Sequence, residues 1–99
     1  MKKVILFCAN GFSTAMLSQK LTAACTRAGK AGEYEFSAFP FSEFQKKSPE
    51  ANIIMLAPQI RFNMKRVQEQ YPDRPVILVD TMAYGTMNAE KIFKQVLEV

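Results

Sequence analysis

Residues 4–14 read Val-Ile-Leu-Phe-Cys-Ala-Asn-Gly-Phe-Ser-Thr, and this stretch decides the fold. Its first four residues form a continuous aliphatic and aromatic run, which is typical of a parallel strand buried on both faces. The segment from Gly11 to Thr14 ends the run, and a helical pattern follows to about Lys30, where Gly29 and Gly32 end it. The positions that share one face of this predicted helix are Leu17, Leu21, Cys25 and Ala28.

Strand and helix patterns continue to alternate along the rest of the chain. Residues 33–39 alternate polar and apolar side chains, which predicts a half-exposed strand at a sheet edge, closed by Pro40. Two further apolar runs, 53–56 and 76–79, predict buried strands. Helices are predicted for about 41–47, after Pro58 and from about Asn88. The helix after Pro58 carries Ile60, Met64, Val67 and Tyr71 at helical spacing, and the last helix buries Ile92, Phe93, Val96 and Leu97.

The predicted sheet is parallel, because strands that alternate with helices are joined by right-handed crossovers. The edge character of the second strand favours the order 2-1-3-4, in a small flavodoxin-like α/β sheet with helices on both faces. We expect residues 1–99 to form a single domain. Ligands of such sheets bind beyond the carboxyl ends of the strands, where the winding reverses. Here that point is the end of the first strand, and Cys8 is the residue there.

The composition excludes several classes of chemistry. The sequence has no histidine, so it cannot form a Ser-His-Asp triad, a Cys-His pair or an imidazole metal site by itself. Cys8 and Cys25 do not form a C-x-x-C motif, and we expect no disulfide, no metal and no cofactor. The net charge is +4, but the basic residues are scattered in pairs, so we expect attraction for anionic ligands and not a nucleic-acid interface.

The apolar runs are too short for a signal peptide or a membrane span. The first of them stops at Asn10-Gly11, and no later stretch approaches the length that a bilayer requires. We therefore expect a soluble cytoplasmic protein that does not insert into the membrane, and we expect it to be a monomer.

The segment from Cys8 to Thr14 has the composition of an anion-binding loop. Successive backbone N–H groups in a loop that joins a strand to a helix form a concave anion site, and the helix N-terminus adds about half a positive charge. Such a site favours a thiolate at Cys8 and also the dianion formed when that sulfur is phosphorylated. Gly11 permits a positive φ and places no Cβ beneath the anion.

Structural roles are the alternatives for the same residues. Ser13 and Thr14 are explained as well by a helix cap as by hydroxyl donation to phosphate. Cys8 has the alternative of a small buried hydrophobic residue at a strand end. Cys25 shares a helix face with Leu17, and we expect it to be a core residue.

The loop around Cys8 resembles the phosphocysteine loop of the enzyme IIB component of lactose/cellobiose-type phosphotransferase systems. The resemblance rests on residues 6–14 (Leu-Phe-Cys-Ala-Asn-Gly-Phe-Ser-Thr), continues through 57–60 (Ala-Pro-Gln-Ile) and 79–85 (Val-Asp-Thr-Met-Ala-Tyr-Gly), and covers nearly the whole chain. The family often has Ser-Ala-Gly-Met where this chain has Ala-Asn-Gly-Phe, and Gly-Pro-Gln where it has Ala-Pro-Gln. These differences remove one possible hydroxyl donor and leave Cys8 and Gly11 in place.

The resemblance implies a phosphoryl carrier. A phosphohistidine on a separate IIA protein would donate its phosphoryl group to Cys8, which would pass it to a sugar bound by a membrane IIC protein. The sugar would be a β-glucoside or disaccharide such as cellobiose, chitobiose or lactose. By the same resemblance, the backbone amides around the phosphate would come from Ala9, Asn10, Gly11, Phe12, Ser13, Thr14 and Ala15. The rim of the site would be lined by Pro58, Gln59, Asp80, Tyr84 and Gly85.

Two other classes of function remain as alternatives. Low-molecular-weight tyrosine phosphatases and arsenate reductases also place a cysteine after the first strand, but in the pattern C-x₅-R. Here the sixth residue after Cys8 is Thr14, so the arginine that would hold the transferred phosphoryl group is missing. A signalling or docking domain without covalent chemistry would use exposed Phe41 and Phe44 or the basic face Arg61–Lys65. Arg61 is also a candidate for a phosphate or partner contact, with a solvated surface arginine as the alternative.

Overall fold

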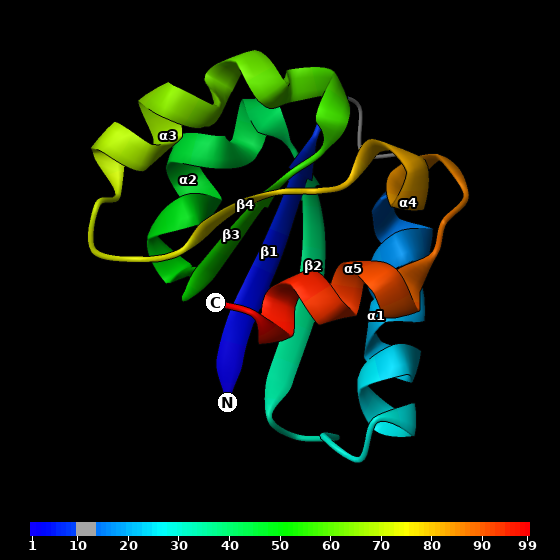
Figure 1. The fold of residues 1–99 in the computed structure, drawn as a ribbon. Coiled ribbons are helices and arrows are strands. Elements are labelled where there is room, and N and C mark those ends of the chain that lie inside the picture. Colours follow the sequence, from blue (N-terminus) through cyan, green and yellow to red (C-terminus); the bar gives the residue numbers. More distant parts are fainter. Residues whose placement is uncertain (10–13) are drawn as a thin grey trace.

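Four parallel strands form one sheet in the order β2-β1-β3-β4, in a computed structural model that describes residues 1–9 and 14–99. The α/β class, the parallel pairing and the predicted strand order are thereby confirmed. β2 lies at an edge, as its alternating side chains predict. The strands are β1 (Lys2–Cys8), β2 (Tyr34–Pro40), β3 (Ile53–Leu56) and β4 (Val76–Leu78), and all four point the same way in Figure 1.

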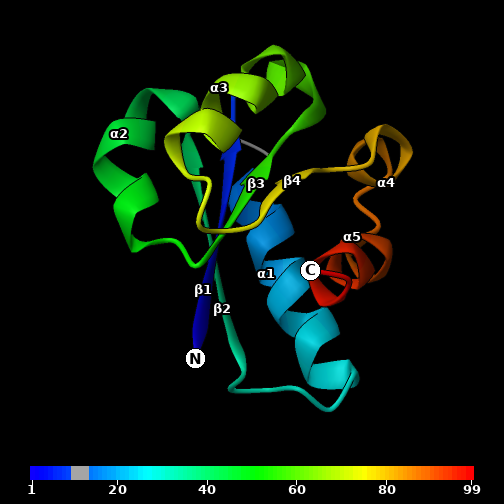
Figure 2. The same cartoon turned by 60° about the vertical axis from the view of Figure 1, so that its left-hand side comes forward.

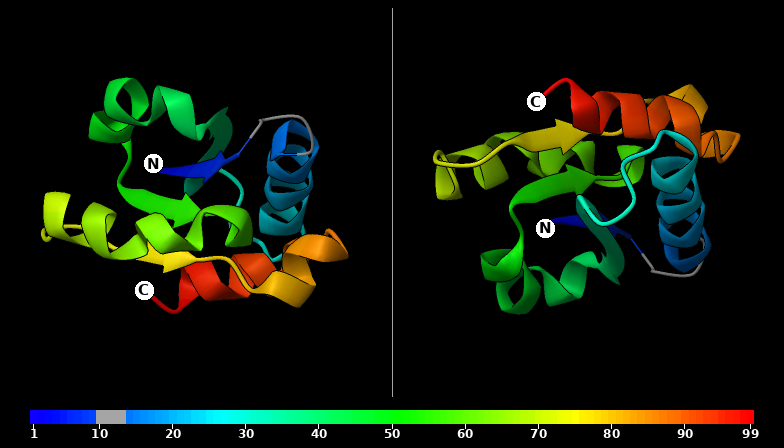
Figure 3. Two further views of the ribbon diagram at one scale, coloured as in Figure 1. Left: turned by 90° about the horizontal axis from the view of Figure 1, so that it is seen from above. Right: turned by 90° about the horizontal axis from the view of Figure 1, so that it is seen from below.

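Helices cover both faces of the sheet. One face is covered by α1 (Thr14–Arg27) and α5 (Ala89–Leu97), and the other by α2 (Phe44–Lys47) and α3 (Met64–Gln70), as Figures 2 and 3 show from different sides. Among the described residues there are also three short 3-10 segments and one further helix: η1 (Phe41–Glu43), η2 (Ser48–Glu50), η3 (Pro58–Asn63) and α4 (Thr81–Gly85).

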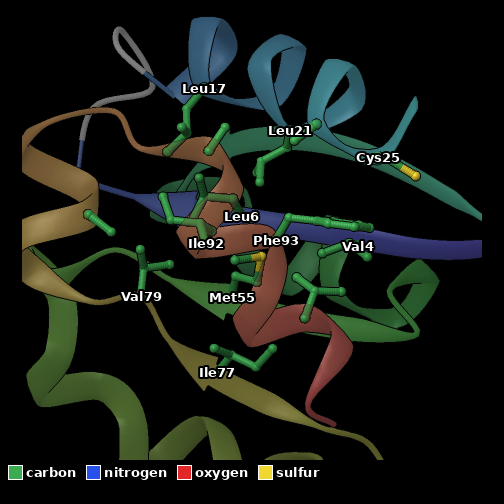
Figure 4. Packing of buried hydrophobic residues seen from close by; sticks show 14 of the residues in the cluster. Val4, Leu6, Leu17, Leu21, Cys25, Met55, Ile77, Val79, Ile92 and Phe93 are labelled. Atoms are coloured by element: carbon green, nitrogen blue, oxygen red, sulfur yellow. The ribbon is translucent and has the colours of Figure 1, made fainter. Parts of the chain in front are cut away.

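Alternate side chains of β1 enter two separate apolar clusters, because successive residues of a strand point to opposite faces. Val4 and Leu6 belong to the cluster beneath α1 and α5, whereas Ile5 and Phe7 belong to the cluster beneath α2 and α3. The continuous apolar run at the start of the sequence therefore serves both faces. Figure 4 shows the first cluster, with Leu17 and Leu21 directed from α1 toward the sheet and with Ile92 and Phe93 of α5 beside them.

The ends of α1 and α5 differ from the prediction. α1 stops at Arg27 and not near Lys30, so Ala28 is exposed and Ala24 takes the buried position on this face. Leu97, which the helical spacing predicts to be buried, is 40% exposed. Leu97 and Ala28 line the same open groove between the end of α1 and α5.

Phe41 and Phe44 are not exposed as the docking alternative expects: Phe44 belongs to the second cluster and Phe41 packs against it. The Phe44 ring lies 4.9 Å from the Phe7 ring in an edge-to-face arrangement, and the Phe41 ring lies 6.5 Å from Phe7. Phe44 is buried and Phe41 is half-buried. These two rings anchor the connection between β2 and β3 to the second cluster.

Candidate functional site

Cys8 lies between the carboxyl ends of its two neighbouring strands. It is the last residue of β1, and Pro40 of β2 lies opposite it in the parallel register. On the other side, the Ala57 N–H donates to the Phe7 carbonyl over 2.9 Å, which continues the pairing of β1 and β3 to the residue before Cys8. The chain winds from β1 to β2 on one side and crosses to β3 on the other, so Cys8 lies where the winding reverses.

The side chain of Cys8 points to the face that α1 covers. Cys8 follows Leu6 by two residues in a regular strand and so shares its face. Leu6 packs in one cluster with Leu17, which lies in the first turn of α1. The N-terminal end of α1 therefore lies over the end of β1 on the side of the Cys8 sulfur. Cys8 is 2% exposed, and among the described residues it is a member of neither apolar cluster.

The predicted phosphate loop is described in part. Asn10, Gly11, Phe12 and Ser13 lie outside the described residues. Ala9 and Ala15 are exposed on either side of that segment, and Thr14 is the first residue of α1. The first N–H groups of an α-helix have no partner within the helix itself, so the start of α1, six residues after the cysteine, is a candidate source of donors for an anion.

Pro58 and Gln59 follow β3 and begin η3, as their place in the predicted rim requires. Pro58 is buried and occupies the first position of the segment, where a missing N–H costs no hydrogen bond. Gln59 is exposed at the same edge. Ala57 lies between β3 and these two residues, and its hydrogen bond to Phe7 holds the start of η3 beside the end of β1. The structure brings them to the carboxyl edge next to Cys8.

Asp80 follows β4 and caps α4. Its Oδ2 accepts from the Ala83 N–H over 2.9 Å and lies 3.8 Å from Nζ of Lys91. The Gln95 side chain holds the same segment from α5, because its Oε1 accepts from the Asp80 N–H over 3.1 Å and its amide nitrogen donates to the Leu78 carbonyl over 3.1 Å. The described contacts of Asp80 therefore fix the start of α4, and β3 separates β4 from the strand of Cys8.

Tyr84 and Gly85 lie on α4 at the same edge of the sheet. Tyr84 is half-buried and packs against the cluster that contains Leu6, whereas Gly85 is exposed. The helix ends in a Schellman motif, with the Asn88 N–H donating to Ala83 over 2.8 Å and the Met87 N–H to Tyr84 over 3.1 Å. Met87 occupies the left-handed position with φ of 54°. The motif turns the chain from α4 into α5.

Cys25 is a core residue, as its helix face predicts. It is 2% exposed, packs in the cluster with Leu21, and donates its S–H to the Lys30 carbonyl over 3.1 Å. Burial raises the pKa of the Cys25 thiol, and the negative charge of Glu33 raises it further. No disulfide joins Cys25 to Cys8. The two thiols thus lie at opposite ends of the region that α1 covers.

The sequence interpretation missed three kinds of residue at this edge. Pro40 was interpreted only as the end of a strand, although its place beside Cys8 follows once the register is known. Gln95 looked like a polar residue on a surface helix, and nothing in its spacing indicates that it bonds to the end of β4. The third kind is a set of exposed apolar side chains, which carry no sequence signal because apolar residues are expected to be buried: Met16, Phe62 and Met82.

Two further findings concern the described part of the chain. Within residues 1–9 and 14–99, no three Cys, Asp or Glu side chains come together as a metal site would require. In the same residues, no helix is both long enough and apolar enough to cross a bilayer.

The fold and the place of Cys8 define a doubly wound α/β protein with a cysteine at the point where the winding reverses. The sequence pattern of the family described as "PTS system, Lactose/Cellobiose specific IIB subunit" matches residues 3–95, and the chain belongs to this family. It is thus a IIB component of a sugar phosphotransferase system.

Known relatives agree in length with this chain. It is 29% identical to the oligo-beta-mannoside-specific EIIB component of Bacillus subtilis (strain 168), over all of this chain and 96% of that protein. It is 28% identical to the galactose-specific EIIB component of Lactococcus lactis subsp. cremoris (strain MG1363), over 92% of this chain and 89% of the relative.

Solved structures show the same fold. The cellobiose-specific phosphotransferase IIB component of Borrelia burgdorferi superposes with a TM-score of 0.74 and 29% identity, over 98% of this chain and 89% of that chain. The lactose-specific IIB component domain of Streptococcus pneumoniae gives a TM-score of 0.81 over 98% and 95%. At 18% identity this second likeness concerns the fold alone.

Proposed function

We propose that Cys8 is the phosphoryl acceptor of this IIB component. The observation that carries the proposal is the position of the sulfur, at the carboxyl end of an inner strand and on the face where α1 begins. A helix N-terminus stabilises both a thiolate and a phosphorylated sulfur. The absence of histidine from the chain agrees with a phosphohistidine that is supplied by a separate IIA protein.

The proposed reaction consists of two transfers in sequence. The Cys8 thiolate attacks phosphorus, an S–P bond forms, and the P–N bond of the IIA phosphohistidine breaks with its electron pair returning to the imidazole nitrogen. A hydroxyl of the sugar, which is bound to the IIC protein, then attacks the same phosphorus and loses its proton to a base. The S–P bond breaks, and the Cys8 thiolate is restored. The chain thus carries the phosphoryl group from IIA to the sugar.

Several residues would support the phosphoryl group in this proposal. Backbone amides of residues 9–15 and the N-terminus of α1 would bind its oxygens, while Pro58 and Gln59 would flank it from the end of β3. Asp80, Tyr84 and Gly85 would line the side formed by α4. Because Cys8 is 2% exposed, the transfer also requires the sulfur to become accessible to the donor. The related components act on β-mannosides, galactose, lactose and cellobiose by name, so we propose a β-glycoside or related disaccharide as the sugar.

Phosphoryl transfer from purified phosphorylated IIA, followed by mass mapping of peptides, tests the assignment. We expect one phosphoryl group on the peptide that contains Cys8, no acceptance by Cys8→Ser or Cys8→Ala, and normal acceptance by Cys25→Ala. A label on Cys25, or acceptance by either Cys8 variant, would contradict the proposal. A phosphatase would instead release inorganic phosphate from an aryl phosphate without IIA, and a docking domain would gain no mass.

A further inference from the structure

The two outer strands of the sheet differ in how their free edges are protected. At one edge, β4 is only three residues long, and the Gln95 side chain bonds to the Leu78 carbonyl and to the Asp80 N–H. At the other edge, β2 pairs with β1 over seven residues in a continuous parallel register without a bulge. β2 contains one charged residue, Glu35, and its only proline stands at its end. The features that protect exposed edges in natural sheets are thus present at β4 and absent along the middle of β2.

The backbone groups on the outer side of β2 belong to alternate residues. The Lys2 N–H donates to the Glu33 carbonyl over 3.0 Å, and alternate residues of a strand bond to the same neighbour, so Ser37 directs its backbone groups to β1. Phe36 and Ala38 therefore direct theirs outward, and within residues 1–9 and 14–99 these groups have no backbone partner. Both residues are half-buried. Each of them offers one donor and one acceptor to a further strand.

The charges beside β2 fit a second copy of the same strand. Glu35 is exposed, and Nζ of Lys47 on α2 lies 4.9 Å from the centre of the Phe39 ring. Among the described residues, neither Glu35 nor Lys47 forms an ion pair. When two β2 strands run antiparallel with Ser37 on the twofold axis, Glu35 of each copy lies directly opposite Phe39 of the other, within reach of Lys47 there. The surface is then complementary to itself, as a twofold interface requires.

We propose that β2 is a dimerisation surface, to which a second copy of this chain adds its own β2 antiparallel about Ser37. In this register Phe36 of one copy lies opposite Ala38 of the other. Because both residues direct their backbone groups outward, each such pair exchanges two N–H···O hydrogen bonds. The same two side chains lie on the face of the sheet that α1 covers and supply apolar contacts there. A dimer replaces the monomer that is expected from the sequence.

The geometry limits the assembly to two chains. The outer edge of β4 is closed by Gln95 in each copy, so the joined sheet does not extend further. Because the two β2 strands run antiparallel, the carboxyl edges of the two sheets face opposite directions. The added strand pairs with β2 and not with β1, so the proposed role of Cys8 does not depend on the dimer.

Sedimentation equilibrium from micromolar to millimolar concentration tests for the dimer, with neither IIA nor IIC present. We expect the weight-average mass to rise from the 11.2 kDa of one chain toward twice that value. A mass that stays at one chain over the whole range would overturn the proposal. Growth well beyond two chains would also overturn it, because the edge at β4 would then not be closed.

Charge reversal tests the register. Glu35→Lys should raise the dissociation constant of the dimer about tenfold at low ionic strength, because each new lysine then faces Lys47 of the other copy. The double variant Glu35→Lys, Lys47→Glu should restore the original value, since it rebuilds the ion pair with exchanged signs. The matched control is Glu69→Lys, an exposed glutamate on α3 without an ion pair in the described chain, and it should change nothing. Failure of the double variant to restore association would contradict this register.

A disulfide cross-link tests the position of the axis. Ser37→Cys places a thiol of each copy beside the twofold axis, and molecular oxygen as the oxidant should join the two into a dimer that a reductant separates again. Peptide mapping should locate the bond between the two residues at position 37. Gln68→Cys, at an exposed position on α3, is the control, and an equal yield from it would contradict the pairing through β2. Failure of the proposed function is recognised separately, by the absence of a phosphoryl group on Cys8.

Discussion

Cys8 and Cys25 are equally buried, but their surroundings differ. Cys25 packs among the side chains of an apolar cluster, and its S–H donates to a backbone carbonyl. Cys8 lies at the end of a strand on the face where a helix begins, outside both clusters of the described residues. Exposure alone therefore does not separate a structural thiol from a candidate nucleophile.

Cys25 should resist alkylation in the folded protein. Because its pKa is raised by burial and by Glu33, the reactive thiolate forms only at higher pH than in an ordinary cysteine, so the alkylation rate should stay low at pH about 8 and rise only in stronger base. Iodoacetamide labelling across a pH series, with peptide mapping, measures this. The same labelling in urea is the control, where Cys25 should react quickly. Equal rates in the folded and unfolded chain would contradict the expectation.

The helix α4 shows how one side chain fixes an element. α4 was not predicted, because Thr81–Gly85 is too short for a helical period and ends in glycine; the only local signal is Asp80 as a cap. Its placement depends on Gln95, fifteen residues further along, whose two hydrogen bonds span Leu78 and Asp80. Hydrogen bonds between residues this far apart cannot be predicted from the local sequence. By contrast, the four strands could be predicted from apolar runs and from the alternation of polar and apolar residues, because both patterns lie within the strand itself.

Replacement of Gln95 by leucine should destabilise the protein. Gln95→Leu leaves the Asp80 N–H and the Leu78 carbonyl without this partner, so the free energy of unfolding should fall by about 1–3 kcal/mol. Gln95→Glu, which keeps an acceptor for the Asp80 N–H, should lose less. Urea denaturation measures both. The matched control is Gln68→Leu, an exposed amide on α3, for which a loss as large as that of Gln95→Leu would count against the explanation.

Across the whole molecule, the two apolar clusters meet in the same strands. β1 and β3 each send alternate side chains into both clusters, so neither cluster can form without the sheet that the other also needs. The class and the strand order could be predicted because the strands alternate with helices and the second strand has the pattern of an edge strand, whereas the exposed ends could not be predicted. Ala28 and Leu97 lie at the ends of α1 and α5, and the end of a helix depends on tertiary packing, which periodicity does not contain.

A cavity in one cluster should therefore weaken the entire fold. Phe7 is completely buried and contacts the rings of Phe41 and Phe44, so Phe7→Ala should lower the free energy of unfolding by about 3–5 kcal/mol. Urea denaturation followed by far-UV and near-UV circular dichroism should give coincident single transitions. Leu97→Ala, at a half-open position, should change the free energy by less than about 1 kcal/mol. Two separated transitions would show that the clusters unfold independently.

The burial of β1 on both faces also affects how firmly its register, and with it the direction of the Cys8 side chain, is fixed. In a strand with one wet face, a slip of one residue would bring polar groups into the core, and that cost holds the alignment. This cost is absent between Val4 and Phe7. Val4 and Leu6 could exchange faces with Ile5 and Phe7, and none of these four side chains would bring a polar group into the core. The sizes of these side chains oppose a slip, and in one direction so does the cost of moving the charged Lys3 into the buried position of Val4. A single-codon deletion here would thus risk a chain that still collapses and folds while its sulfur faces away from α1.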